Sequence, residues 1–451
     1  MRSVPGRRAA VPSTQRSPQT ARSVASYRHA PAVPASPFKG VHWSLSYAAL
    51  LLYVVVIVTY AVPYGYVIMS VALIGLLLEA RLRLPAFLVL FGALVGLAFL
   101  SQFSSLWAPI VREESLEFGK LWLIALVAVC TLRDRPRARL FMLIFLGAFA
   151  LYPVRGALVN YFVGGYSVQG RAIWNYIYAN PNDLAALTLL ALSVTAAFFV
   201  AEPRGWLRRL SFAGLVVLPI LILLTQSRGV FIGLVFFAVV ALAGHRNKIR
   251  IAGFAFVVLI ASTMVLPSSA WERLGMVKTL GSGGVEALDK VNDEGSAGQR
   301  YEIWRTSFRI IRDHPVSGIG WSAYPRANAL YAPRLGARDT HSTYLNIAAE
   351  IGIPGLLLFL LVIGVVATRA ELARRRLVRL QPVDALQIRL LLLGLAGFLI
   401  AGVFGSYGKL TFLYLHLVLI WVITDLALRR NRARHMARPR QAVQPAWRGG
   451  A

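Results

Sequence analysis

Residues 181–200 have the sequence PNDLAALTLLALSVTAAFFV, in which Asp183 is the only charged residue. An α-helix rises about 1.5 Å per residue, so a run of this length spans the roughly 30 Å hydrocarbon core of a bilayer. Twelve such runs are predicted, some of them short enough that their ends must extend into the flanking residues. They run approximately from Trp43 to Tyr60, Pro63 to Leu78, Pro85 to Phe103, Leu116 to Leu132, Ala138 to Val159, Pro181 to Val200, Leu210 to Leu224, Gly229 to Ala243, Ile251 to Leu266, Pro354 to Thr368, Leu390 to Phe404 and Lys409 to Leu428.

The composition predicts an all-α, polytopic membrane protein. Apolar residues make up 57% of the 451 residues, charged residues make up 15%, and the mean hydropathy is +0.61, which excludes a water-soluble fold. The net charge of +29 does not indicate nucleic-acid binding, because the basic residues lie in short clusters between apolar runs and not on one folded face. The single cysteine, Cys130, excludes a disulfide framework within the chain and a cysteine-based zinc site.

The distribution of charge predicts the topology. Lys and Arg gather in alternate connections and in both tails, which the positive-inside rule places in the cytoplasm. The opposite connections are poor in basic residues and are predicted to be external, which in a bacterium means periplasmic. The basic clusters are Arg81 and Arg83, Arg133 to Arg139, Arg204 to Arg209, Arg246 to Arg250, and Arg369 to Arg389.

These predictions divide the chain into five parts. A disordered cytoplasmic tail covers residues 1–42, a membrane domain with spans 1–9 covers 43–266, and a large periplasmic loop covers 267–340. A second membrane domain with spans 10–12 covers 341–428, and a basic cytoplasmic tail covers 429–451. The loop is basic, but long translocated loops escape the charge rule.

The large loop contains a predicted amphipathic helix from Gln299 to Arg312. It is expected to end at Asp313-His314-Pro315 and to lie along the membrane surface. Its apolar residues recur at helical spacing and are Tyr301, Trp304, Phe308 and Ile311.

Two of the seven histidines, His314 and His341, are predicted to be external. The others lie in or beside cytoplasmic segments or, for His416, within the last span. His314 precedes a proline at a helix end, which is typical of a capping or surface role. His341 therefore is the stronger candidate for chemistry.

His341 precedes a predicted helix in the sequence DTHSTYLNIAAEIGIPG. Ser342 or Thr343 can cap this helix, which runs nine residues before Gly352 and Pro354 kink it. His341 would then stand roughly 14 Å above the kink, where the helix dipole favours the neutral imidazole. Two interpretations remain open: a general base, and a histidine that packs at a helix start.

Two arginines accompany His341 on the predicted external side. Arg228, in TQSRG, begins a membrane helix and either binds a ligand or reaches lipid headgroups. Arg300 begins the amphipathic helix and either binds a ligand or belongs to a solvated basic face. A neutral base and two guanidiniums suit a reaction in which a hydroxyl attacks and a pyrophosphate leaves. The external segments lack metal-ligand spacing and a phosphate-cradling glycine loop, so neither metal nor cofactor is predicted.

These residues resemble the O-antigen ligase and polymerase superfamily, membrane enzymes that handle undecaprenyl-pyrophosphate-linked glycans on the periplasmic face. The matching motifs are NPND at 180–183, TQSRG at 225–229, RYEIW at 300–304 followed by HPVSGIG at 314–320, and HSTYLNIAAEIGIPG at 341–355. Family members commonly have asparagine after the histidine, where this chain has Ser342.

The resemblance implies transfer of a polysaccharide from undecaprenyl pyrophosphate to a sugar of lipid A-core, with inversion, in the bacterial inner membrane. Donor, acceptor and membrane lipid would be the partners. By the same resemblance His341 would be the base, and Arg228 and Arg300 would bind the pyrophosphate. Arg171 and Lys120 are added as further pyrophosphate-binding candidates because they are basic and predicted to be external.

Alternatives within and outside the superfamily remain. A polymerase joins repeat units, and a protein O-oligosaccharyltransferase uses a protein Ser or Thr as acceptor. Twelve spans with one dominant external loop resemble ligases more than either. A lipid or solute transporter would show ionisable residues at mid-membrane depth and an internal repeat, and neither is evident.

Overall fold

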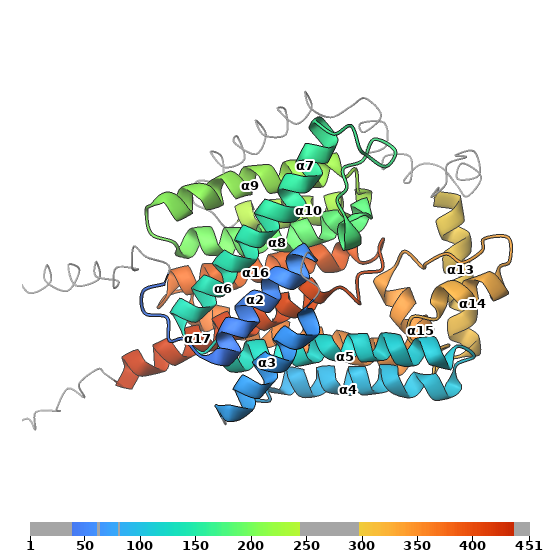
Figure 1. Ribbon diagram of the computed structural model, residues 1–451, viewed down its shortest axis with the longest axis horizontal. Helices are drawn as coiled ribbons and strands as arrows, with labels where there is room; N and C mark the ends of the chain where they lie inside the picture. Colours follow the sequence, from blue (N-terminus) through green and yellow to red (C-terminus); the bar gives the residue numbers. More distant parts are fainter. Residues whose placement is uncertain (1–37, 61–63, 80–81, 244–296, 437–451) are drawn as a thin grey trace, which may run out of the picture.

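The structure is a computed structural model that describes residues 38–60, 64–79, 82–243 and 297–436, and every regular element within those ranges is helical. The predicted ninth span and residues 267–296 of the predicted loop lie outside the described residues. Figure 1 shows a bundle of long helices that carries two further helices at one end. The helices are α2 Leu45–Thr59, α3 Gly65–Leu78, α4 Ala86–Leu100, α5 Ala108–Thr131, α6 Arg135–Phe149, α7 Arg155–Phe162, α8 Pro181–Ala201, α9 Trp206–Leu224, α10 Arg228–Ala243, α13 Ala297–Asp313, α14 Tyr324–Tyr331, α15 Thr343–Leu377, α16 Pro382–Ala401 and α17 Thr411–Met436.

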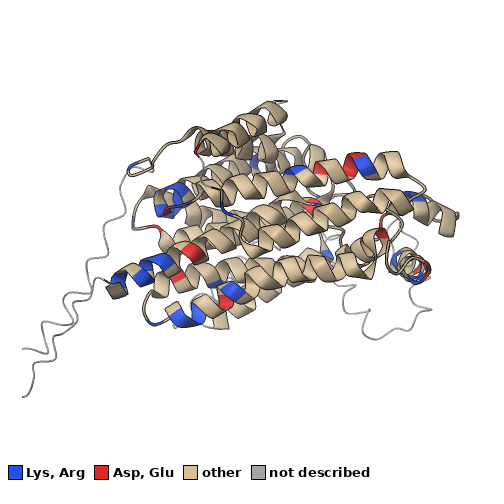
Figure 2. Cartoon of the chain, turned by 90° about the horizontal axis from the view of Figure 1, so that it is seen from below, with Lys and Arg blue, Asp and Glu red and all other residues tan. Residues whose placement is uncertain are grey.

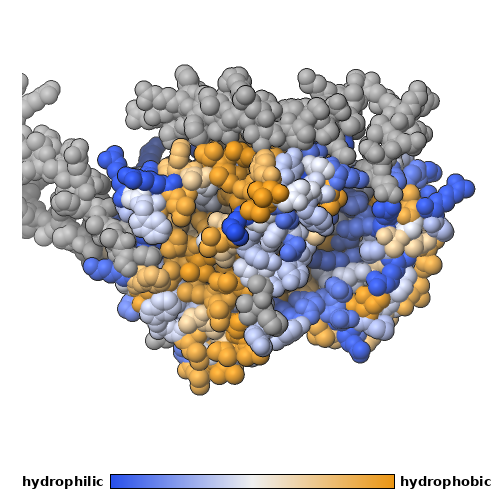
Figure 3. Space-filling view, turned by 45° about the horizontal axis from the view of Figure 1, so that its top comes forward, coloured by the Kyte–Doolittle hydropathy of each residue, from blue (hydrophilic) through white to orange (hydrophobic). Residues whose placement is uncertain are grey.

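The chain is a membrane protein by the length and composition of its helices. Among the described residues, seven helical segments are long and apolar enough to cross a bilayer, and α2, α3 and α10 are shorter apolar helices. Many large apolar side chains on them are exposed, which in this setting means that they face lipid. Figure 3 shows a broad apolar area on one face, with hydrophilic residues toward its edges.

Each predicted apolar run within the described residues lies on a helix, but several helices are longer than predicted. α5 begins at Ala108, eight residues before the apolar run, because its first turns carry charged residues such as Arg112 and Glu114. α17 continues to Met436 through a basic segment. α15 joins the predicted span to the predicted helix beside His341. The total of twelve spans stays a prediction.

Helix α8 is the centre of the bundle, and it packs against α9, α10 and α16. Nearly all its side chains from Leu184 to Phe198 are buried. α10 and α16 cross so closely that a Cβ on Gly233 would lie 2.4 Å from the carbonyl oxygen of Gly397. Small residues permit this close approach. Within a bilayer the hydrophobic effect does not drive helices together, so the van der Waals packing at such a contact stabilises the helix pair instead.

The basic clusters that lie within the described residues gather at one end of the bundle, which is called the basic end below. Figure 2 shows the concentration of blue residues at that end, near the end of α17. Ion pairs join clusters that are far apart in sequence: Arg135 and Arg430 both bind Asp384, and Arg139 binds Glu202. The charge alternation in the sequence thus corresponds to a real polarity of the fold.

The predicted kink in α15 is confirmed. Ile351 and Gly352 have non-helical backbone angles, with φ of 74° at Gly352. The break frees backbone groups that residues 315–320 satisfy: Ile319 N donates to the Ala349 carbonyl at 3.0 Å, and Gly320 N to the Glu350 carbonyl at 2.9 Å. A Cβ on Gly352 would lie 2.2 Å from the carbonyl oxygen of Val316, so only glycine fits. The HPVSGIG and EIGIPG motifs therefore bind each other through backbone hydrogen bonds at the kink.

The predicted helix from Gln299 to Arg312 is confirmed as α13 and ends at Asp313, as expected. Its predicted apolar face is wrong in part, because Tyr301 is 49% and Phe308 61% exposed. The face that packs on α14 and α15 carries Ile303, Thr306, Ser307 and Ile310 instead. Small hydroxyl residues allow close approach, and Ser307 Oγ lies 2.6 Å from Tyr324 Oη.

Candidate active site

His341 lies in the turn that leads into α15, at the end of the bundle opposite the basic end. Its φ of 51° is in the left-handed region, which a non-glycine residue rarely adopts. Thr340 fixes the turn: its Oγ1 accepts from Ser342 N at 3.1 Å, and its carbonyl accepts from Trp304 Nε1 of α13 at 3.0 Å. Within the described chain the imidazole itself forms no hydrogen bond, so neither ring nitrogen is engaged by another residue there.

Ser342 is the N-cap residue of α15, as predicted, but its side chain makes no capping hydrogen bond. The first amide of the helix, Thr343 N, donates instead to the carbonyl of Gly402 at 2.8 Å. Thr343 Oγ1 in turn donates to the Gly405 carbonyl and accepts from Tyr407 N. The start of α15 is therefore held by the α16–α17 connection.

Arg300 is in the first turn of α13 and is partly buried. Its Nε is a buried donor with no hydrogen-bond partner in the part of the chain that the structure describes. The Arg228 guanidinium lies near enough to repel it, and Tyr407 near enough to interact with it. A buried donor on one of two adjacent guanidiniums is costly unless an anion binds between them.

The TQSRG motif connects α9 to α10 and organises a second arginine, Arg171. Arg171 Nε donates to the Thr225 carbonyl, and its Nη2 donates to Asn182 Oδ1, each at 2.8 Å. Gln226 Nε2 donates to the Gly170 carbonyl at 2.9 Å. The motif thereby fixes the loop that carries Arg171 beside the N-terminus of α8.

Tyr407 is the buried residue that these segments share. It forms a side-chain hydrogen bond with Ser227 of TQSRG, and its Oη donates to the Asn182 carbonyl at 3.4 Å. Asp183, Arg300 and Arg171 all lie near enough to its hydroxyl to interact electrostatically. The site therefore draws on α8, the TQSRG connection, α13, the turn before α15 and the α16–α17 connection.

The electrostatics favour a neutral His341. Burial, and then the Arg300 charge, lower the pKa of His341 from its ordinary value of 6.5, with Arg338 acting in the same direction and Asp339 opposing them. Burial and the Arg228 charge also lower the pKa of Arg300, although a guanidinium stays protonated at any ordinary pH. A neutral proton acceptor therefore lies beside a group of fixed positive charges, an arrangement suited to proton removal with stabilisation of a departing anion.

Of the five residues predicted from sequence, the structure groups His341, Arg228, Arg300 and Arg171. Lys120 lies elsewhere, on α5, where its ammonium group binds Glu117 and Tyr66. His314 also lies apart, at the end of α13, where its Nε2 is 3.3 Å from Tyr331 Oη. That placement agrees with the structural role predicted for it.

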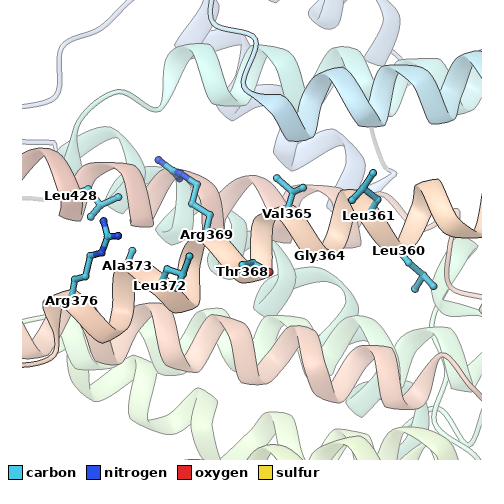
Figure 4. Close-up of a pocket in the computed structure, with 10 residues that line it drawn as sticks. All are labelled: Leu360, Leu361, Gly364, Val365, Thr368, Arg369, Leu372, Ala373, Arg376 and Leu428. Carbon is cyan, nitrogen blue, oxygen red and sulfur yellow. The ribbon is translucent and has the colours of Figure 1, made fainter.

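A groove of about 710 Å³ on the membrane-facing side of α15 is not part of this site. Figure 4 shows it along the half of the helix that leads to the basic end, with Leu360 and Leu361 at one end and Arg376 at the other. Arg369 on its edge is engaged by Asp425 of α17 at 3.1 Å and lies 3.8 Å from the Trp421 ring. That arginine serves the contact between α15 and α17.

Four site residues were not singled out from the sequence: Asn182, Asp183, Asp339 and Tyr407. NPND was noted only as a motif of the resemblance, without a role for its residues, and the DTH segment only for its histidine. The signal that would have found Asp339 is its place two residues before His341. Tyr407 carries no local signal, because its role comes from contacts with segments far away in the chain.

A comparison with known families gives one match in the region of this site. The model of the O-antigen ligase family matches residues 212–360. That stretch extends from α9 into α15 and contains Arg228, Arg300 and His341, whereas Arg171 and Tyr407 lie outside it. No curated protein matches the chain. The match confirms the resemblance to the O-antigen ligase superfamily.

Proposed function

We propose, with the O-antigen ligase match of residues 212–360 as premise, that this chain is an inverting glycosyltransferase of the inner membrane. It moves a polysaccharide from undecaprenyl pyrophosphate to a sugar hydroxyl of lipid A-core on the periplasmic face. The observation that carries the proposal is the buried Arg300 Nε, which has no hydrogen-bond partner among the described residues and lies near Arg228 and His341; this fits an anionic leaving group next to a base.

The reaction divides among the residues as follows. His341, neutral, removes the proton of the acceptor hydroxyl, whose oxygen attacks the anomeric carbon of the donor glycan from the face opposite the leaving group. The bond from that carbon to the phosphate oxygen breaks, and its electron pair leaves with undecaprenyl pyrophosphate. Arg228 and Arg300 bind the developing negative charge, and Arg171 adds a third positive charge near them. The proton ends on His341 and is lost to solvent.

A reconstitution experiment tests the activity. Purified protein in proteoliposomes, supplied with a lipid-pyrophosphate glycan and lipid A-core, is expected to form glycan-bearing lipid A-core, resolved on a gel. With the acceptor omitted, the glycan should stay on its carrier. Glycan chains that lengthen on the carrier would identify a polymerase, and transfer to an added Ser- or Thr-containing protein would identify an oligosaccharyltransferase; either result would refute the ligase proposal.

The orientation in the membrane has its own prediction. Because the basic end collects the Lys and Arg clusters, we expect it, and both chain termini, in the cytoplasm, and His341 in the periplasm. Reporter fusions measure this: an alkaline phosphatase fusion near Gly284 should be active, and one after Ala451 inactive. The reverse pattern would contradict the topology and would place the candidate site on the wrong side for the donor.

A further inference from the structure

The groove on the membrane-facing side of α15 has a volume of about 710 Å³, which is within the range of small-molecule binding sites. Its walls come from α15 and, through Leu428, from α17. One end is apolar, with Leu360 41% and Leu361 50% exposed, and Figure 4 shows both of them at the end away from Arg376. Because Arg376 lines the other end, the groove is apolar at one end and cationic at the other.

The length of the groove matches one leaflet of a bilayer. From Leu361 to Arg376 the helix rises about 22 Å, and half of a bilayer with its headgroups is about 20 Å thick. From the kink at Gly352 to Arg376 the helix rises about 36 Å, which is more than the roughly 30 Å of the hydrocarbon core. The apolar end of the groove therefore lies toward the bilayer centre, and Arg376 lies at the depth of the headgroups at the basic end.

The positive charge of Arg376 is not balanced by an acidic residue of the described chain. Glu371, the nearest acidic residue on the same helix, binds Arg374 and Arg375 instead. Asp425, the acidic residue at the edge of the groove, is likewise shared by two other arginines. Basic pockets between membrane helices on the cytoplasmic side are typical sites for anionic lipid headgroups, so the charge of Arg376 fits a phosphate.

The middle of the groove has room for a hydrocarbon chain. A Cβ on Gly364 would have no neighbouring heavy atom within 4 Å apart from the backbone of its own helix, so the helix surface is open there. Leu372, which lies between Gly364 and the cationic end, is 50% exposed. The exposed hydroxyl of Thr368 forms no hydrogen bond within the described chain, and it lies on the same wall. An apolar chain with a polar group near one end fits these surroundings.

We propose that this groove binds one anionic phospholipid from the leaflet at the basic end. The lipid phosphate pairs with Arg376, an ester oxygen accepts from the Thr368 hydroxyl, and one acyl chain lies along Gly364 to Leu360. The site is at the end of the bundle opposite His341, so the inference does not depend on the proposed function. Lipid bound there covers the contact between α15 and α17.

The test is native mass spectrometry of the full chain in detergent, titrated with phosphatidylglycerol or with phosphatidylcholine of the same acyl chains. The quantity measured is the Kd of the first bound lipid. Gly364→Leu fills the apolar part of the groove, and Arg376→Gln removes the charge at its end. Gly147→Leu is the control for the first variant, because Gly147 of α6 also has open space at its Cβ but lies outside the groove. Arg375→Gln, at the exposed neighbouring arginine, is the control for the second.

The wild type is expected to bind phosphatidylglycerol about 5-fold more tightly than phosphatidylcholine, the usual effect of one arginine near an anionic headgroup. Arg376→Gln should lose this preference and keep the affinity for phosphatidylcholine. Gly364→Leu should weaken the binding of both lipids about 10-fold, because the leucine side chain takes the volume of the acyl chain. The two control variants should bind both lipids as the wild type does.

Equal affinity of the wild type for the two lipids, or unchanged lipid binding by Gly364→Leu, would overturn the proposal. Displacement of the lipid by inorganic phosphate alone would show a site for free phosphate, and dimers that Gly364→Leu abolishes would show that a second copy of the chain covers the groove. Either result would also overturn it. Arg376→Gln changes a side chain without an ion pair in the described chain, so it gives an answer even if Gly364→Leu does not fold.

Discussion

His341→Ala is expected to lose about 10²- to 10⁴-fold of the transfer rate, the usual contribution of a positioned general base. The His341 side chain is partly buried, and its ring nitrogens form no hydrogen bond in the described chain, so its removal takes away a reactive group and few structural contacts. Initial rates in proteoliposomes at matched protein levels measure the loss. His314→Ala is the control on the same external region, and it should keep a near-normal rate because its contact is with Tyr331.

The transfer rate of the wild type is also expected to depend on pH. A base must be neutral to accept a proton, so the wild-type rate should fall as the pH drops through the pKa of His341. Burial and the Arg300 charge lower that pKa below 6.5, so the rate should hold to a pH below the ordinary histidine range before it falls. A near-normal rate in His341→Ala would refute the assignment, and the same acid limb in its residual activity would show that another group titrates.

Arg228→Ala and Arg300→Ala are each expected to lower transfer about 10- to 150-fold, because each removes a charge-assisted contact of about 1.5 to 3 kcal/mol to the leaving pyrophosphate. Lysine should rescue poorly, since it cannot form the two-pronged contact of a guanidinium. Single-turnover rates with the lipid-linked donor measure the effect. Arg309→Ala, an exposed arginine on the same helix as Arg300, should be close to wild type.

The Arg300→Ala variant is also expected to show a shifted pH dependence of the transfer rate. The Arg300 charge opposes protonation of His341, so removal of Arg300 should raise the pKa of His341 and move the acid limb of the rate to higher pH. Full activity of both alanine variants at normal expression would show that these side chains only anchor the protein at the membrane surface.

The sequence predicted those parts of the fold that depend on local pattern. Apolar runs of bilayer length and the kink at Gly352 follow from hydropathy and glycine placement, and both appear in the structure. α13 likewise follows from its periodicity, but the face that it buries does not. Ile303 and Ile310 pack inward with Thr306 and Ser307 because of the shape of α14 and α15, which periodicity does not encode.

Residue type and side of the membrane made Arg171 and Lys120 equal candidates, and only the tertiary structure separates them. Arg171 is joined to the TQSRG connection by a bond across 54 residues, whereas Lys120 pairs with its own helix neighbour Glu117. Tyr407 reaches Asn182 across 225 residues, a contact that no local pattern encodes. The chain by itself determined that there are membrane helices, a basic end, and a histidine and arginines at the opposite end. Which charges meet there was decided by the packing of α8, α13 and α15, because burial brings side chains within interaction distance regardless of their separation in sequence.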